Sequence, residues 1–244
     1  MGMMSQQRRL DVVSNNIANV NTAGYKKDTT VTSTFDQALA RRTNDLKDRI
    51  WPPMIKSVGP ITYGALIDEI HTDFSAGPLK TTGGTYDLAI EGGGFFVVNT
   101  PNGLRYTRDG TFTVDKDDYL RTADGGFVQG RNGNIRIPHG MVSIERNGEI
   151  SVGDEPVDQL RMVDFEDYTT LRKQAKNNYS TTAQTTEKPV EGGIIQGTLE
   201  VSNVNIVKEM VDLITINRIF ESNQKMIQTI DTTLQRSVQE VGRK

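Results

Sequence analysis

A strict seven-residue repeat of apolar side chains runs through the C-terminal part of the chain. It fills six of six positions, and two further apolar residues follow three places later in their heptads: Ile206, Leu213, Phe220, Ile227, Leu234 and Val241, with Ile216 and Ile230. This spacing keeps one helix stripe facing a partner, as in a coiled coil. About 36 residues would form a helix of about 54 Å. An amphipathic helix packed on its own domain is the alternative, although a compact domain of this size does not easily bury that length.

The N-terminal residues carry a shorter version of the same pattern. Apolar side chains lie seven apart, and a second set follows three places later: Met3, Leu10 and Ile17, with Val13 and Val20. Gln6 weakens the early part of this second set. The helix should end near residues 19–21, with Gly24 as a left-handed stop. A helix of about 20 residues is marginal alone in water, so it needs a partner, and the C-terminal helix is the obvious one.

Between the two ends the pattern changes to that of short strands. Twenty of the 23 glycines lie between Gly59 and Gly197, and all eight prolines lie between Pro52 and Pro189. Asn-Gly, Asp-Gly and Gly-Gly pairs, which suit turns with positive φ, separate the strand-like segments. These segments are 86–90, 95–99, 104–107, 111–114, 119–122, 127–130, 135–137, 142–144, 149–152 and 160–165. They predict an antiparallel β domain.

The region before this domain has a different pattern. A short helix is predicted over 35–50, because Thr34 and Gln37 form a capping box and the apolar residues of the segment share one face. The polar segment 175–190 is expected to be extended and mobile. The whole pattern predicts a mainly β central domain with N- and C-terminal α-helices that pair as a coiled coil, an α+β fold overall. We expect residues 1–27 and 200–244 to form a helical assembly domain, 28–75 a variable linker, and 76–199 a β-rich outer domain.

Composition removes several classes of function. Without cysteine there are no disulfides, thiolate nucleophiles or iron–sulfur sites. A net charge of −3 with no basic block argues against nucleic acid as a partner. No stretch of roughly 18 residues is apolar enough to form a helix that spans a membrane. The N-terminus, MGMMSQQRRLD, becomes polar within five residues, so no cleavable secretory peptide is expected.

Candidate chemical motifs have simpler structural explanations. Gly92–Gly94 follows a strand-like segment but precedes another strand rather than a helix, so we expect a tight turn and not a phosphate loop. Asp115–Asp118 lacks the glycine and glutamate of a calcium loop. His71 and His139 have no second ligand at metal-binding spacing. The sequence predicts no catalytic residue, cofactor, metal site or small-molecule substrate.

Four blocks of sequence resemble one protein family. Residues 14–27 read SNNIANVNTAGYKK, residues 87–98 DLAIEGGGFFVV, residues 106–130 YTRDGTFTVDKDDYLRTADGGFVQG, and residues 199–210 LEVSNVNIVKEM. In this order they resemble the bacterial flagellar rod and hook proteins. The signature residues that carry the resemblance at the two ends are Ser14, Asn15, Asn16, Asn19, Asn21, Gly24, Tyr25, Ser202 and Asn203.

This resemblance implies a self-assembling axial protein of the flagellum that transmits torque from motor to hook. In that family the terminal helices pair as an inner coiled-coil layer, the β domain forms an outer layer, and subunits stack helically into a tube. The expected partners are copies of itself, other rod and hook proteins, the flagellar type III export apparatus and, in a cell with an outer membrane, the outer ring proteins. The expected location is the basal body, outside the cytoplasmic membrane.

The expected assembly interface is the apolar stripe of both helices: Leu10, Val13, Ile17, Val20, Ile206, Leu213, Phe220, Ile227, Ile230, Leu234 and Val241. The sequences LEVSNVN (residues 199–205) and EGGGFF (residues 91–96) most resemble those of distal rod members, with hook and proximal rod members as alternatives. The first helix of the family usually begins further upstream, so either translation starts before Met1 or this helix is shortened. A secreted β-rich adhesin or hydrolase with oligomerising helical ends is the alternative from another class.

Overall fold

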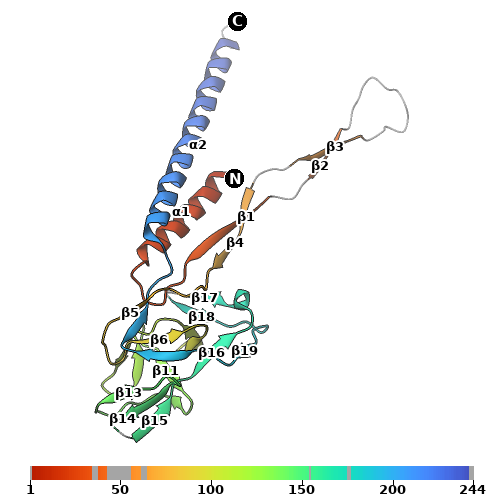
Figure 1. Cartoon of the computed structure of the whole chain (residues 1–244). Helices are drawn as coiled ribbons and strands as arrows, with labels where there is room; N and C mark the ends of the chain where they lie inside the picture. The colour runs from red at the N-terminus through yellow and green to blue at the C-terminus, as the bar shows by residue number, and fades with distance from the viewer. Residues whose placement is uncertain are drawn as a thin grey trace. The chain divides into compact units, whose positions relative to one another are not determined.

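A helix lies near each end of the chain, and the described residues between them form strands, turns and one 3-10 helix, Tyr168–Thr170 (Figure 1). The computed structural model describes residues 2–34, 38–42, 56–61, 65–153, 155–174 and 177–241, with side chains described outside 32–68 and 240–241. Helix α1 spans Gly2–Ala18, and helix α2 spans Ile206–Val241. Gly24 has a φ of 65°, which confirms its predicted left-handed conformation, whereas α1 ends at Ala18, slightly before the predicted end near residues 19–21. The expected α+β class, mainly β with two terminal helices, is confirmed.

The chain divides into two compact units. The helical unit contains Met1–Asn15, Asp28–His71 and Val207–Lys244, and the β domain contains Asn16–Lys27 and Thr72–Ile206. The residues that link the helices to the rest of the chain, 16–27 and 201–206, therefore belong to the β domain. Among the described residues, neither helix is long and apolar enough to cross a membrane.

In the helical unit, burial along α2 follows the heptad pattern in its first half only. Ile216 and Glu209 are buried, Leu213 and Phe220 are half-buried, and from Gln224 every described side chain is exposed. The exposed part carries Met226, Ile227, Ile230, Leu234 and Val238. On α1, Val13 and Ser5 are buried, and Leu10 is half-buried. Each helix therefore has one sheltered face, and the second half of α2 has an uncovered apolar stripe.

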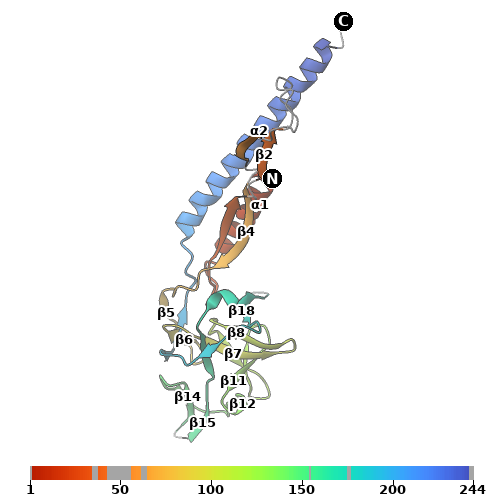
Figure 2. The ribbon, with the colours of Figure 1, turned by 90° about the vertical axis from the view of Figure 1, so that its right-hand side faces the viewer.

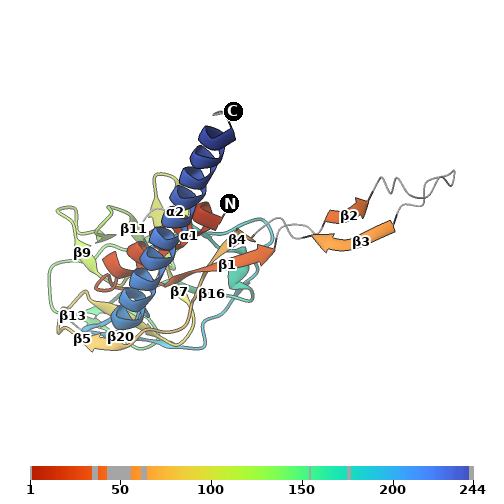
Figure 3. The same cartoon turned by 90° about the horizontal axis from the view of Figure 1, so that it is seen from above.

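The helical unit also contains two strand pairs. Strand β1, Asp28–Thr34, pairs with β4, Ala65–Thr72, and strand β2, Ala38–Arg42, pairs antiparallel with β3, Lys56–Ile61 (Figure 3). The helix predicted over 35–50 is therefore wrong for residues 38–42, and its other residues, 35–37 and 43–50, lie outside the described part of the chain. The local capping pattern gives no information about β3, whose pairing decides the conformation of β2, since helix propensity is a weak prior that tertiary contacts override.

The β domain is built on an antiparallel sheet with the order β17-β18-β8-β7-β11-β10-β9, beside which β12, β16 and β19 pair. The strands of this sheet are β7 (Phe95–Thr100), β8 (Gly103–Thr107), β9 (Phe112–Val114), β10 (Leu120–Thr122), β11 (Phe127–Gly130), β12 (Gly133–Asn134), β16 (Met162–Phe165), β17 (Arg172–Lys173), β18 (Asn178–Ser180) and β19 (Glu187–Lys188). A three-stranded sheet contains β13 (Val142–Ile144), β14 (Glu149–Val152) and β15 (Glu155–Gln159).

Most predicted strands are confirmed, and one is wrong. Residues 127–130, 142–144 and 149–152 form strands with the predicted bounds. Residues 135–137 make a single isolated bridge, at Arg136, although Ile135 and Ile137 are buried. The alternating apolar side chains of this segment are buried, but its backbone forms no regular ladder of hydrogen bonds with a neighbouring strand. The segment 175–190 contains β18 and β19, which pair with β8 and β16.

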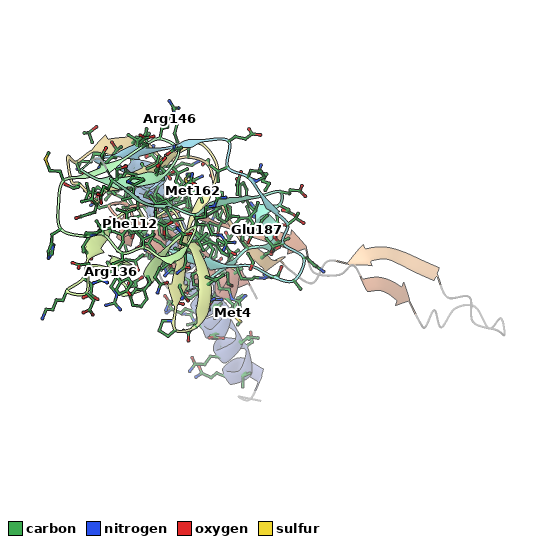
Figure 4. All side chains as sticks on the ribbon, turned by 90° about the horizontal axis from the view of Figure 1, so that it is seen from below. Met4, Phe112, Arg136, Arg146, Met162 and Glu187 are labelled. Atoms are coloured by element: carbon green, nitrogen blue, oxygen red, sulfur yellow. The ribbon has the colours of Figure 1, made fainter. Side chains whose placement is uncertain are left out.

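Strand β7 separates two apolar cores. Three of its four buried residues alternate between them: Phe96 joins the larger cluster, while Phe95 and Val97 join the smaller one. The larger cluster also contains Phe112, and Met162 packs against it. In Figure 4 these two labelled side chains lie inside the β domain, whereas Arg136 and Arg146 lie at its edge. The period-two pattern of a strand thus fills both faces.

Two more strand pairs close the β domain with residues from near its C-terminal end. Strand β20, Gly193–Gln196, pairs with β6, Leu88–Glu91, and strand β21, Thr198–Glu200, pairs with β5, Leu79–Thr81. In Figures 1 and 2, β5 lies at the end of the domain opposite β14 and β15. Residues far apart in the sequence are thereby held at the β5 end.

Candidate functional site

Three signature residues of the N-terminal segment, Asn16, Gly24 and Tyr25, are buried in the β domain. The Tyr25 hydroxyl donates to Oδ1 of Asn16 at 3.1 Å, and both residues are buried. The Gly24 amide donates to the carbonyl oxygen of Glu200 at 2.8 Å. A Cβ on Gly24 would lie 2.3 Å from the carbonyl carbon of Arg108, closer than atoms can approach. Gly24 is therefore required both for its positive φ and for this close backbone contact.

Three buried charged side chains meet beside these residues. Nζ of Lys26 lies 2.6 Å from Oε1 of Glu200, and Nη1 of Arg108 lies 3.2 Å from Oε2 of the same carboxylate. Their side chains are 1%, 2% and 4% exposed for Lys26, Glu200 and Arg108. We call these three residues the buried ion cluster. It joins the N-terminal signature segment, the sheet and the C-terminal signature segment.

Backbone groups complete the surroundings of the buried ion cluster. Lys26 Nζ donates to the carbonyl of Ser75 at 2.7 Å, and Arg108 Nη2 donates to the carbonyl of Gly92 at 2.7 Å. The amide of Gly77 donates to Oε1 of Glu200 at 2.8 Å. With two cations and one anion, the ionised cluster carries one net positive charge, which these carbonyl dipoles offset in part.

Burial changes the ionisation of Lys26. Desolvation of its ammonium lowers the pKa below the usual value, the carboxylate of Glu200 opposes this shift, and Arg108 adds to it. The lowered pKa thus comes mainly from burial, with a second cation nearby. Such pKa shifts occur in structural ion-pair networks as well as in functional sites.

The C-terminal signature residues complete the same region. Asn203 accepts from the amide of Lys27 at 2.8 Å, and its amide nitrogen donates to the carbonyl of Asp73 at 2.9 Å and the hydroxyl of Ser75 at 3.0 Å. Ser202 is buried, and its hydroxyl accepts from the Val204 amide at 3.3 Å. One polar side chain thus fixes three segments that are distant in the sequence.

We call this region the junction: residues 16–27, 73–77, 107–109, 177 and 200–204. Asn177 adds a further tie, because its amide nitrogen donates to the carbonyl of Ala23 at 2.8 Å and its own carbonyl accepts from the Thr107 hydroxyl at 2.9 Å. We call the segments that join the two helices to the β domain, residues 16–27 and 200–204, the roots of the helices. The arrangement holds both roots against the sheet. Its hydrogen bonds and ion pairs connect segments that are distant in the sequence, which is a structural role.

The signature residues are not all part of the junction core. Asn16, Gly24, Tyr25 and Ser202 are buried there, and Asn203 is half-buried. Of the others, Asn19 accepts from the Thr22 hydroxyl at 3.2 Å and is half-buried, Asn21 and Asn15 are exposed, and Ser14 is half-buried in α1.

Sequence reasoning missed the charged members of the junction. Lys26 and Glu200 both lie inside the blocks that carry the resemblance, and Arg108 lies in a third. The presence of these charged residues within the signature blocks was the signal from which they could have been singled out. Nothing in the local pattern indicated that they meet.

The predicted interface residues fall into two groups by burial. The sheltered ones are Val13, which is buried, and Leu10, Ile17, Val20, Leu213 and Phe220, which are half-buried. The exposed ones are Ile206, Ile227, Ile230 and Leu234. The side chain of Val241 lies outside the described residues.

The other candidate sites considered among the described residues contain no catalytic arrangement. Within the described ranges, no three His, Asp or Glu side chains gather as a metal site would require. A surface cavity of about 760 Å³ lies between the β11–β12 and β15–β16 segments, and its lining contains Arg131, Arg161, carboxamides and apolar side chains. Glu187 pairs with Arg161 at 3.5 Å beside it. This lining contains neither a nucleophile nor a base suited to hydrolysis.

Sequence models of three flagellar families match separate parts of the chain. "Flagella basal body rod protein" matches residues 1–26, "Flagellar hook protein FlgE/F/G D1 domain" matches 89–152, and "Flagellar basal body rod FlgEFG protein C-terminal" matches 195–240. The first and last of these matches contain the N- and C-terminal segments that meet in the junction.

Whole-length relatives show the same similarity. The chain is 36% identical to the flagellar basal-body rod protein FlgF of Caulobacter vibrioides, over 98% of this chain and 94% of the relative. It is also 36% identical to the rod protein FlgG of Bacillus subtilis, over 97% of this chain and 95% of the relative. FlgG of Borreliella burgdorferi is 31% identical, over 96% and 93%.

Proposed function

Because the chain belongs to the family of flagellar basal-body rod proteins, we propose that it is built into the rod as a helical polymer whose subunits join through their terminal helices. Family membership makes it a structural, non-enzymatic component of the flagellar basal body that assembles with other rod and hook components. The mode of assembly, its interface and its place along the rod are the parts proposed here.

The uncovered apolar stripe on the second half of α2 carries this proposal. Ile227, Ile230 and Leu234 are 46%, 52% and 58% exposed and lie at heptad spacing. Complete burial of such a side chain is worth about 1.5–3 kcal/mol, so neighbours that cover three of them supply several kcal/mol before ordering costs. The stripe fits the helix of a second copy.

The sheltered first half of α2 has a different role in the proposal. Leu213, Ile216 and Phe220 on α2 are spaced three and four residues apart, as are Leu10, Val13 and Ile17 on α1. We infer that the two helices pair here as a short coiled coil within one subunit. The free half of α2 then extends the same seam to other subunits.

Its proposed position is the distal rod, where it would transmit torque from motor to hook. This assignment rests on the wording of residues 91–96 and 199–205, and the alternatives are the proximal rod and the hook. The proposed route is the flagellar type III export apparatus, and the proposed location is outside the cytoplasmic membrane. Where an outer membrane is present, the outer ring proteins are the proposed surrounding partners.

The interface proposal is tested by a matched pair of substitutions on α2. Leu234→Asp places a charge in the stripe, whereas Thr232→Asp places the same charge two residues away on the opposite side of the heptad. We expect Leu234→Asp to prevent incorporation into rods while the β domain stays folded, and Thr232→Asp to assemble normally. Electron microscopy of purified basal bodies and circular dichroism of the purified proteins measure the two properties. Normal rods built from Leu234→Asp would contradict the interface.

The position along the rod is tested by deleting the gene. A truncated rod without a hook supports the distal assignment. A complete rod that lacks only the hook moves the protein to the hook, and loss of the whole rod moves it to the proximal rod. Intact rods with normal hooks would contradict the rod role proposed here.

A further inference from the structure

Three turns of the β domain contain an exposed asparagine that precedes a glycine: Asn102-Gly103, Asn132-Gly133 and Asn147-Gly148. The backbone nitrogen of such a glycine can attack the carboxamide carbon of the asparagine, because glycine has no side chain that blocks the approach. Asn132 and Asn147 lie in the same tripeptide, Arg-Asn-Gly, so the local sequence does not distinguish them. The structure, however, gives the three carboxamides different surroundings.

The carboxamide of Asn147 is held by several groups. Its oxygen accepts from the Glu149 amide at 2.7 Å, and its nitrogen lies 3.4 Å from a carboxylate oxygen of Glu145 and from one of Glu149. The Gly148 amide, which would be the attacking group, donates to the carbonyl of Glu145 at 2.9 Å. Negative charge develops on the attacking nitrogen and on the carboxamide oxygen, so the two carboxylates oppose the attack.

Asn132 and Asn102 differ both in hydrogen bonding and in the charge nearby. The Asn132 carboxamide donates to a carboxylate oxygen of Asp158 at 3.1 Å. Among the described residues, the Asn102 side chain makes no hydrogen bond, and a cation lies close to it: a Cβ on Gly103 would be 3.9 Å from Nη1 of Arg105. A guanidinium at this distance stabilises the negative charge that develops during the attack. Asn102 therefore has the least restrained carboxamide of the three and the most favourable charge beside it.

We propose that Asn102 is the first of these three asparagines to deamidate in the folded protein. The Gly103 nitrogen forms a bond to the carboxamide carbon of Asn102 and gives up its proton, while the bond from that carbon to the side-chain nitrogen breaks and ammonia leaves. Water then opens the resulting ring at either carbonyl, which yields aspartate or isoaspartate. The reaction consumes only solvent water and involves no oxidation or reduction. The inference goes beyond the proposed polymer and does not depend on it.

This modification would change the tip of the β7–β8 hairpin. Thr100 lies opposite Gly103 in the ladder, and the Thr100 hydroxyl donates to the Gly103 carbonyl at 2.8 Å. Isoaspartate lengthens the main chain of the turn by one methylene group, so we expect this terminal pair to loosen. Phe96 and Val97, which are buried further along β7, should keep their positions. Both products also place a negative charge on an exposed turn.

Peptide mapping by mass spectrometry measures the three rates in the purified full-length protein during incubation at neutral pH. A hydrogen bond that must first break slows the attack about two- to tenfold, and one unit charge about 5 Å away changes the rate about fourfold in a medium like water. We therefore expect Asn102 to deamidate at least about fivefold faster than Asn132, and Asn147 to be the slowest. Equal rates, or any order in which Asn102 is not first, would overturn the inference.

Two substitutions of Arg105 test the charge argument. Arg105→Gln removes the cation and should slow deamidation of Asn102 about fourfold, whereas Arg105→Lys keeps the charge and should preserve most of the rate. The rates at Asn132 and Asn147 in the same samples are internal standards. In urea these two asparagines should react equally fast, because their tripeptides are identical. An unchanged rate at Asn102 in Arg105→Gln, or a difference between Asn132 and Asn147 that persists in urea, would overturn the structural explanation.

Discussion

Gly24→Ala is the sharpest test of how closely the N-terminal segment docks on the sheet. The added methyl group would lie 2.3 Å from the carbonyl carbon of Arg108, 2.4 Å from the amide nitrogen of Asp109 and 2.5 Å from the Arg108 carbonyl oxygen. These are backbone atoms, which cannot rotate away as the end of a side chain can. The two segments would have to separate by about 1 Å to reach ordinary van der Waals contact.

The cost of this substitution has two separable parts. Alanine at a φ of 65° costs about 1–2 kcal/mol in backbone strain. Separation of the segments lengthens the 2.8 Å bond from the Gly24 amide to Glu200, worth about 0.5–1.5 kcal/mol, and disturbs the adjacent Lys26–Glu200 pair. We therefore expect a total loss of about 3 kcal/mol or more in the free energy of unfolding.

Gly125→Ala measures the first part alone, so the difference between the two variants gives the second. Gly125 also has a positive φ, 83°, but a Cβ there meets no atom within 4 Å, so only the backbone strain of about 1–2 kcal/mol applies. Thermal and urea unfolding of the full-length variants measure both costs. At about 2–4 °C per kcal/mol for a chain of this size, Gly24→Ala should melt about 6–12 °C below the unsubstituted protein. Equal losses in the two variants would refute the close approach at Gly24.

Further predictions concern pH, the core and the helices. Burial and the hydrogen bond to Asp164 raise the pKa of Tyr168 to about 12. The hydroxyl therefore stabilises the fold fully below the pKa of an unfolded tyrosine, about 10, and this contribution is lost as the pH rises through about 12. Across that pH range the urea midpoint should fall for the unsubstituted protein and fall less for Tyr168→Phe. Leu120→Ala, at a fully buried position, should lower the urea-derived free energy of unfolding by about 2–5 kcal/mol, and a smaller loss would contradict its place in the core. The exposed half of α2 should gain helix on assembly, so dilute full-length protein should show less helical circular dichroism than 36 residues of α2 predict, and full helicity in the monomer would refute this.

Local patterns predicted those parts of the fold that local physics decides. The bounds of β11, β13 and β14 followed from glycine-containing turns that fix where short strands begin and end. The left-handed conformation of Gly24 was predicted from its expected role as the stop of the first helix, which ends earlier, at Ala18. The 36 residues of α2 followed from a heptad repeat without glycine or proline.

The missed features depend on contacts that local patterns do not contain. Residues 38–42 form a strand because β3 lies beside them, although their own sequence suggests a helix. Lys26 and Glu200 are 174 positions apart, and each alone looks like a solvated surface charge. The site was therefore predictable as a set of signature residues, while its central ion cluster required the three-dimensional arrangement.

The direct bonds between the two roots have a mechanical consequence. Gly24 and Lys26 bond to Glu200, and Lys27 bonds to Asn203, so the polypeptide between Lys27 and Glu200 forms a large loop closed at its neck. The neck consists of the two bonded segments, residues 24–27 and 200–203. A tensile load applied to α1 and α2 would pass directly from one of these segments to the other and not through the polypeptide of the loop. While the neck holds, hairpin tips such as 101–103 and 147–148 bear none of that load, and the loop can vary in length without weakening the path of force.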